Sequence, residues 1–135
     1  MTIRQLDDWT FIGAQIRPEE VAGLAQMGVS LIVNNRPDGE EPGQPLGVEI
    51  EEAATAAGID YRSVPIIRGI GPADADAIND AIGSTNGKTL LYCRSGNRSA
   101  LAWALAQSDQ GVAREEIEEK LARVGVDPTP IAHLL

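Results

Sequence analysis

A strand-to-helix turn is predicted by the run Cys93-Arg94-Ser95-Gly96-Asn97-Arg98-Ser99, which contains the only cysteine of the 135-residue chain. The preceding residues, Lys88 to Tyr92, are typical of a buried strand, and Ser99 to Gln107 are typical of a helix. Backbone N–H groups converge in such a turn, and the N-terminus of the following helix adds partial positive charge. The run therefore predicts an anion-binding site that favours the thiolate form of Cys93, the expected nucleophile.

The residue types in this run favour a ligand site over a purely structural turn. Free cysteines are usually buried apolar residues, but the residues that follow Cys93 are poor core residues and good anion ligands. Gly96 permits close approach of the backbone, and the Arg98 fork can hold two oxygens of one oxyanion. The alternative is that Arg98 is a surface residue paired with an acid. For Arg94, the backbone N–H is expected to serve the site while the side chain points to solvent.

Strand-like and helix-like segments alternate along the chain. Strands are expected at Trp9–Gly13, Val29–Asn34, Ile59–Pro65 and Lys88–Tyr92. Helices are expected from Pro18 to a stop at Gly28, at Glu49–Ala57, Gly71–Ile82, Ser99–Gln107 and Ala113–Val124, and after Pro128. This alternation predicts an α/β fold in which helices cover both faces of a mostly parallel central sheet of about four to five strands. No linker or repeat divides residues 1–135, so one domain is expected.

Three polar segments follow strands of the predicted sheet and are expected to meet at one edge. In open parallel sheets, ligands bind at the carboxyl ends of the strands. That rule brings together the Asn34-Asn35-Arg36 segment, the Pro65 to Gly69 segment and the turn that begins at Cys93. The sequence therefore predicts a composite site at the carboxyl edge of the sheet.

The segment after the expected strand at Val29–Asn34 has two interpretations. Its Pro37-Asp38-Gly39 sequence is typical of an ordinary turn. The functional alternative brings Arg36 or Asp38 into the site, with Asn35 and Arg36 as supporting residues. Asp38 or Glu40 would then be the general acid that protonates a leaving group, and Asp38 is the residue we assign to that role.

The overall charge narrows the class of ligand. A formal net charge of -9 argues against binding to nucleic acid or to anionic membranes. Arg36, Arg94 and Arg98 nevertheless cluster around the predicted site. Because arginine recognises planar and tetrahedral oxyanions, this contrast indicates a small anionic substrate that is held locally.

Residue usage also limits the compartment and the cofactors. A single cysteine excludes an intramolecular disulfide and fits a reducing compartment. No apolar run has the length of a signal peptide or of a membrane helix, so a cytoplasmic location is expected. His133 is the only histidine and Cys93 the only cysteine, so no metal site is expected. No cofactor is expected either. The Gly83 to Thr89 segment lacks the spacing of a nucleotide-binding loop and is expected to be a helix-to-strand turn.

Three stretches of the chain resemble one protein family. They are Gly13-Ala14-Gln15-Ile16-Arg17-Pro18-Glu19, Val33-Asn34-Asn35-Arg36-Pro37-Asp38-Gly39-Glu40-Glu41 and Tyr92 to Ser99. These stretches resemble the phosphatase-like domain of the beta-lactamase hydrolase-like proteins, with a similarity that covers about residues 3–110. The resemblance implies the fold of the dual-specificity and tyrosine phosphatases, in which a cysteine thiolate attacks phosphorus and an arginine clamps the phosphoryl oxygens.

The resemblance also implies roles for individual residues. Cys93 matches the nucleophile, and Arg98 matches the arginine that stabilises charge in the transition state. The Ser95-Gly96-Asn97 segment matches the phosphate cradle, and Ser99 would supply a hydroxyl that helps the thiolate to leave. The implied substrate is a small anionic phosphoester or a phosphorylated protein.

Two features depart from the usual phosphatase pattern. Four residues separate Cys93 from Arg98 where five are usual, and Tyr92 stands in place of a histidine. The Val64 to Gly69 segment, where the general-acid aspartate is usually found, contains no acid. The short loop is also similar to that of the rhodaneses, so a sulfurtransferase that carries a persulfide on Cys93 is an alternative function. A non-enzymatic anion-binding module is a third.

Overall fold

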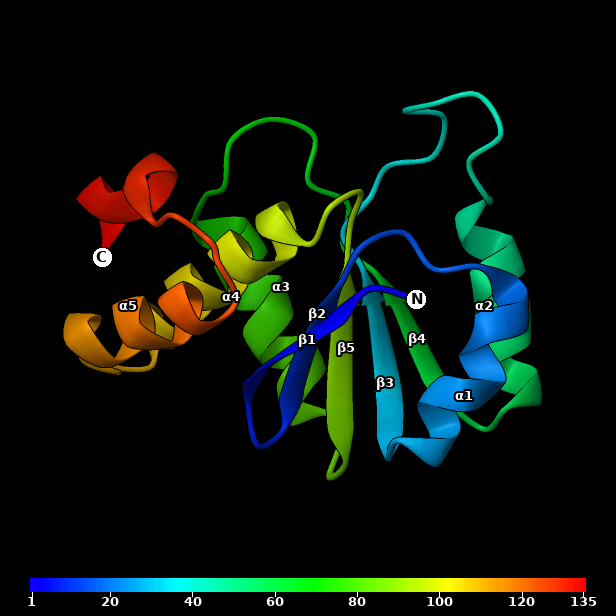
Figure 1. The fold of residues 1–135 in the computed structure, drawn as a ribbon. Coiled ribbons are helices and arrows are strands. Elements are labelled where there is room, and N and C mark those ends of the chain that lie inside the picture. Colours follow the sequence, from blue (N-terminus) through cyan, green and yellow to red (C-terminus); the bar gives the residue numbers. More distant parts are fainter.

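The structure, a computed structural model, describes residues 1–135 and contains a five-stranded sheet with helices on both faces (Figure 1). The strands are β1 (Ile3–Asp7), β2 (Thr10–Gly13), β3 (Val29–Asn34), β4 (Asp60–Ser63) and β5 (Lys88–Tyr92). The helices are α1 (Val21–Gln26), α2 (Gly47–Ala56), α3 (Pro72–Gly83), α4 (Asn97–Asp109) and α5 (Arg114–Arg123), with 3₁₀ helices η1 (Pro18–Glu20) and η2 (Thr129–Leu134). None of them combines the length and hydropathy of a membrane-spanning segment. The predicted α/β class is confirmed.

The central strands are buried on both faces. The strand order is β1-β2-β5-β3-β4, and every neighbouring pair is parallel except β1 with β2. Leu90 and Tyr92 of β5 pack in the core that includes Leu24 of α1, whereas Leu91 packs in the core that includes Trp103 of α4. Because each fully buried large side chain contributes about 1.5–3 kcal/mol, both layers stabilise the sheet. The strand ends are then the parts of the sheet that remain available for function.

The N-terminal hairpin differs from the expected elements. The sequence predicts one strand at Trp9–Gly13, but the structure also has β1, which pairs antiparallel with β2 at the edge of the sheet. Of the five residues of β1, only Leu6 is buried. An edge strand of this kind lacks the apolar run that marks a buried parallel strand, so periodicity does not reveal it.

Hydrogen bonds beyond the strand ends position the carboxyl edge of the sheet. The Asn35 N–H donates to the Tyr92 carbonyl at 2.8 Å, which extends the pairing of β3 with β5. The Val64 N–H donates to the Asn34 carbonyl at 2.8 Å, and the Ile66 N–H donates to the Asn35 carbonyl at 3.0 Å. The segments after β3, β4 and β5 are thus joined side by side, as the rule for parallel sheets predicts.

Candidate active site

Cys93 lies directly after β5, at the carboxyl edge of the sheet, and is 1% exposed. Its N–H donates to the Gly13 carbonyl at 3.2 Å, which continues the pairing of β2 with β5. Its Sγ accepts a hydrogen bond from the Gly96 N–H at 3.1 Å. Helix α4 begins at Asn97, two residues earlier than expected, so the sulfur lies at the N-terminus of a 13-residue helix. That end of a helix favours negative charge.

Gly96 allows the Cys93 loop (Cys93 to Arg98) to close around the sulfur. Its φ of 97° lies in the left-handed region that glycine adopts without strain. A Cβ atom at this position would lie 2.9 Å from Arg4 Nη2 and 3.4 Å from the Gly13 carbonyl oxygen. The backbone conformation therefore requires glycine, and a larger residue would also displace the Arg4 side chain.

Replacing Gly96 with alanine is expected to lower the free energy of unfolding by about 1–2 kcal/mol, because an L-residue is strained in the left-handed region. Urea denaturation measures the loss. The matched control is Gly23→Ala within α1, where an added Cβ meets nothing within 4 Å. That variant is expected to gain up to about 1 kcal/mol from helix propensity. A stabilised Gly96→Ala protein would contradict the requirement for glycine.

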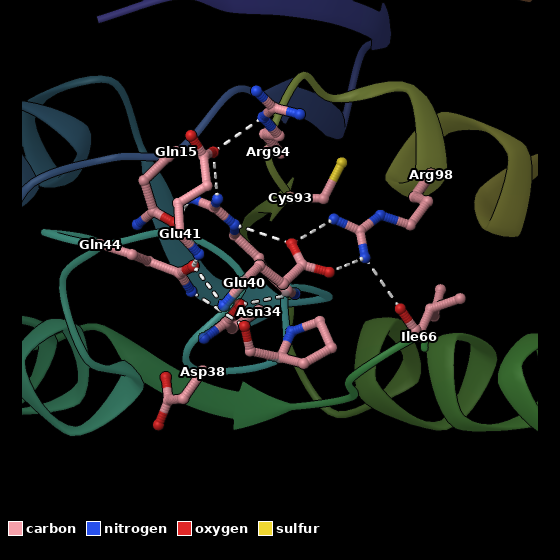
Figure 2. A network of polar contacts seen from close by, with 12 residues as sticks. Gln15, Asn34, Asp38, Glu40, Glu41, Gln44, Ile66, Cys93, Arg94 and Arg98 are labelled. Carbon is pink, nitrogen blue, oxygen red and sulfur yellow. Dashed lines mark hydrogen bonds and ion pairs between the residues drawn. The ribbon is translucent and has the colours of Figure 1, made fainter. Parts of the chain in front are cut away.

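Arg98 uses three of its five N–H donors within the protein (Figure 2). Nη1 donates to Glu40 Oε2 at 2.7 Å and to the Ile66 carbonyl at 2.9 Å, and Nη2 donates to Glu40 Oε1 at 2.8 Å. The remaining donors, Nε–H and the second Nη2–H, form no hydrogen bond within the protein. In the planar guanidinium these two donors lie on one edge, so the edge can bind two oxygens of one oxyanion.

Glu40 is a charged partner of Arg98. The hydrogen bonds from Arg98, together with the one from Arg36, lower the pKa of Glu40 to about 2. In turn, Glu40 raises the pKa of Arg98, and the Cys93 sulfur makes a smaller contribution in the same direction. Glu40 is therefore ionised at neutral pH and has no proton to give to a leaving group.

Asp38, the expected general acid, is directed away from Cys93 (Figure 2). Its Oδ1 accepts a hydrogen bond from the Gly47 N–H at 2.8 Å, at the start of α2. A carboxylate at this position satisfies an N–H of the first helical turn and interacts favourably with the helix dipole. The structure thus corrects the expectation that Asp38 reaches the reacting group.

Gln44 explains why Asp38 and Glu40 point in different directions. Its Oε1 accepts from the Glu40 and Glu41 N–H groups at 3.1 and 3.3 Å. Its Nε2 donates to the Pro37 carbonyl at 2.9 Å. These bonds close the loop on itself, which leaves the two glutamates facing the arginines and Asp38 facing α2. The sequence spacing of Pro37-Asp38-Gly39 does not reveal this closure.

Asn35 and Ser99 are both buried and bond to each other. Ser99 Oγ donates to Asn35 Oδ1 at 2.8 Å, and Asn35 Nδ2 donates to the Val64 carbonyl at 2.9 Å. The Ser99 hydroxyl hydrogen is therefore directed to Asn35 and not to the Cys93 sulfur. This pair joins the first turn of α4 to the ends of β3 and β4.

The remaining residues of the Cys93 loop bond to their surroundings. The Arg94 side chain is 68% exposed, as expected, but its Nε also pairs with Glu41 Oε1 at 2.8 Å. The Arg94 carbonyl accepts from the Gln15 N–H at 3.2 Å. Ser95 Oγ accepts from the Asn97 N–H at 3.2 Å, so that N–H already has a partner.

Arg36 is buried next to the loop, with a side chain that is 4% exposed. Its Nε donates to Glu40 Oε1 at 2.9 Å, its Nη1 to Gln15 Oε1 at 3.0 Å and its Nη2 to Glu41 Oε1 at 2.6 Å. Arg36 therefore contacts the acids that in turn contact the arginines of the loop. Arg36 itself makes no hydrogen bond to the loop.

Sequence reasoning missed two further contributors to the site. Glu41 bridges Arg36 and Arg94, and the adjacent acids Glu40 and Glu41 were the only local signal for it. Arg4 donates from Nη2 to the Ser95 carbonyl at 3.1 Å and from Nη1 to the Val124 carbonyl. Arg4 lies 91 residues from Ser95 in the chain, so no local pattern could have linked them.

Two cavities adjoin the loop between β3 and α2. One, of about 460 Å³, has a polar lining that includes Gln15, Arg36 and Glu41. The other, of about 380 Å³, is lined in part by Asp38 and Arg36. Cys93 lines neither cavity, so a reacting oxyanion would be held by the Cys93 loop itself, with the cavities beside it.

Sequence comparison identifies related proteins. The family model described as "Beta-lactamase hydrolase-like protein, phosphatase-like domain" matches residues 2–110. A beta-lactamase hydrolase-like protein of Xylella fastidiosa is 38% identical over 120 residues, which cover 87% of this chain and 28% of that protein. A namesake from Agrobacterium fabrum is 34% identical over 113 residues, which cover 80% of this chain and 26% of that protein. The chain thus spans little more than a quarter of the length of these relatives.

Solved structures show the same fold. A candidate phosphatase from Neisseria meningitidis superposes with a TM-score of 0.86 at 28% identity and covers 100% of this chain and 99% of its own. TpbA of P. aeruginosa, crystallised in complex with phosphotyrosine, has a TM-score of 0.66 at 18% identity, with 92% of this chain and 74% of TpbA covered. TpbA is similar in fold alone. Together with the kinase-associated phosphatase, these neighbours confirm the expected phosphatase fold.

Proposed function

This chain belongs to the family of phosphatase-like domains of the beta-lactamase hydrolase-like proteins, and we propose that it hydrolyses phosphoesters with Cys93 as the nucleophile. The observation that carries the proposal is the Nε–Nη2 edge of Arg98, which forms no hydrogen bond within the protein and faces Cys93 (Figure 2). Two parallel donors next to a nucleophile match the needs of phosphoryl transfer. One edge binds two phosphoryl oxygens while the sulfur attacks phosphorus.

The proposed reaction has two steps. In the first, the Cys93 thiolate attacks phosphorus, the S–P bond forms and the P–O ester bond breaks. Arg98 and the helix N-terminus at Asn97 stabilise the charge on the phosphoryl oxygens as it develops. In the second, water attacks phosphorus, the S–P bond breaks, and inorganic phosphate and the thiolate are released. The sulfur thus separates one difficult displacement into two easier ones.

The leaving oxygen takes its proton from water in this scheme. Glu40 is ionised, and the Asp38 carboxylate is bonded to Gly47. Substrates with a stable leaving anion, such as aryl phosphates and phosphotyrosine, are therefore the substrate class that we propose. The phosphotyrosine complex of TpbA, a neighbour in fold, agrees with this class.

Asp38→Asn is expected to change kcat for an aryl phosphate by less than about threefold, because Asp38 bonds to the start of α2 and does not act as the general acid. The asparagine side-chain oxygen can still accept from the Gly47 N–H, so the start of α2 should be preserved. The pH–rate profiles of both proteins from pH 5 to 8 measure the effect. A loss of about 10²-fold or more, with a lost pH-dependent limb, would instead identify Asp38 as the general acid.

The direct test of the proposal is phosphate release from a small aryl phosphate between pH 5 and 8. Wild-type protein should release one phosphate per phenol, and Cys93→Ser should not. The sulfur-transfer alternative, which the comparisons do not support, is tested in parallel by treatment with thiosulfate. A mass increase of one sulfur atom on Cys93, without release of phosphate from any aryl phosphate, would overturn the proposal.

A further inference from the structure

An alternating chain of charges joins the two arginines of the Cys93 loop. It runs Arg94–Glu41–Arg36–Glu40–Arg98, with each neighbour pair in direct contact. Figure 2 shows the two outer pairs, Arg94 with Glu41 and Arg98 with Glu40. We propose that Arg36 is a positioning residue, which acts through Glu40 to fix Arg98 for oxyanion binding. The inference rests on the proposed function, because that function assigns Arg98 to the phosphoryl oxygens.

The first step of the argument is that Arg36 is rigidly held. All three of its nitrogens donate to side-chain oxygens, at distances between 2.6 and 3.0 Å. Its side chain is 4% exposed, and a buried charge of this kind persists only where its partners are in place. The backbone of Arg36 is held as well, since its N–H donates to Asn34 Oδ1 at 2.8 Å. Arg36 is thus a fixed point from which other charges can be oriented.

The second step is that the two arms of the chain differ. Glu40 gives both of its oxygens to Arg98 and is 28% exposed in its side chain. Glu41 gives one oxygen to Arg94, and the two side chains are 44% and 68% exposed. Two-point pairing fixes both the position and the plane of a guanidinium, whereas a solvated single contact contributes little. The Glu40 arm is therefore the one that orients a loop arginine.

The third step is that Glu40 orients Arg98 without competing for the oxyanion. Glu40 binds the Nη1–Nη2 edge, and the Ile66 carbonyl takes the other Nη1 hydrogen. The Nε–Nη2 edge stays free, so a carboxylate and a phosphoryl group can occupy different edges of one guanidinium. Within this five-residue chain of charges, three guanidinium groups and two carboxylates leave one net positive charge, which attracts an anion. In this geometry Glu40 orients Arg98 and does not occupy the position of the oxyanion.

The test compares Glu40→Gln with Glu41→Gln. These are isosteric changes of two neighbouring glutamates that both contact buried Arg36. Glu40→Gln is expected to lower kcat for an aryl phosphate by about 10- to 100-fold, the effect of a misplaced catalytic group. It should also raise the Kd for inorganic phosphate, measured by calorimetry on folded protein, by about tenfold. Glu41→Gln removes a charged partner of Arg36 but leaves both Glu40 oxygens on Arg98, so its effect on each quantity should be clearly smaller than that of Glu40→Gln. The surface variant Glu118→Gln, from the exposed Arg114 pair of α5, should change neither.

Arg36→Lys is the second variant, because it changes the arginine that holds Glu40 and leaves the Glu40 carboxylate unchanged. Lysine keeps the buried charge but cannot direct three donors to three partners. It is expected to weaken phosphate binding in the same direction as Glu40→Gln, although Arg36 contacts neither Cys93 nor Arg98. Circular dichroism establishes that each variant is folded at the temperature of the binding measurement.

The outcomes separate this inference from the proposed function. If wild-type protein hydrolyses aryl phosphates and Glu40→Gln behaves like Glu41→Gln, the function stands and the positioning role is overturned. Tighter phosphate binding by Glu40→Gln also overturns it, because Glu40 would then be a competitor. If wild-type protein binds phosphate without turnover, the proposed function fails. The Kd values of Glu40→Gln and Arg36→Lys for phosphate then still decide whether Arg36 acts through Glu40. If wild-type protein binds no phosphate, both fail.

Discussion

Replacing Cys93 with serine is expected to lower kcat for aryl phosphate hydrolysis by at least about 10⁴-fold, as the loss of a nucleophile does in other enzymes with covalent intermediates. A serine hydroxyl has nearly the same size but is far less nucleophilic at neutral pH than a thiolate. Its oxygen can still accept from the Gly96 N–H, so the loop should keep its shape. Steady-state release of phosphate at saturating substrate measures the loss.

The control for this prediction is binding, because the substitution should separate chemistry from recognition. The edge of Arg98 that is free for an oxyanion lies on another side chain. Cys93→Ser should therefore bind inorganic phosphate with nearly the Kd of the wild type. Because Cys93 is the only cysteine, alkylation of the wild type with iodoacetate offers an independent check. Activity that survives either treatment above about a tenth of the wild-type value would contradict a thiolate nucleophile.

The strands that the sequence predicts best are those with two buried faces. Val29–Asn34 and Lys88–Tyr92 have the same bounds in the sequence prediction and in the structure. Their continuous apolar character is a direct consequence of helices on both sides of the sheet. β1 was missed because it is an edge strand with one buried residue, stabilised by its pairing with β2. The fold class depends on the central strands, so it was predictable although one strand was not.

The candidate site was predictable where it depends on local order along the chain. The Cys93 loop follows from one strand, one turn and one helix, and the same order brings Arg98 to the helix N-terminus. The direction of Asp38 and the roles of Glu40 and Glu41 depend instead on contacts across the fold. Arg98 and Glu40 are 58 residues apart, and no periodicity links them. Long-range ion pairs therefore set the parts of the site that sequence spacing leaves open.

Replacing Arg98 with lysine is expected to lower kcat/KM for the same substrate by about 10²- to 10³-fold, the usual effect of losing a donor that stabilises developing charge. Lysine keeps the positive charge but presents a single ammonium in place of two parallel donors on one edge. It also cannot bind both oxygens of Glu40 in one plane, so the Glu40 contact would no longer orient the charge. Initial rates over a range of substrate concentrations give the ratio.

Arg94→Lys is the matched control. Arg94 is the other arginine of the Cys93 loop, so the substitution makes the same change from a guanidinium to an ammonium. Its side chain is 68% exposed and pairs through one contact with Glu41, so the loss should stay below about fivefold. Equal losses in the two variants would mean that the loop needs positive charge and not a directed edge. A larger loss in Arg94→Lys would mean that Arg94, on the exposed side of the loop, binds the oxyanion in place of Arg98. The predicted order, with Arg98 far more sensitive than Arg94, follows from burial and from donor geometry, since the formal charge of the two residues is the same.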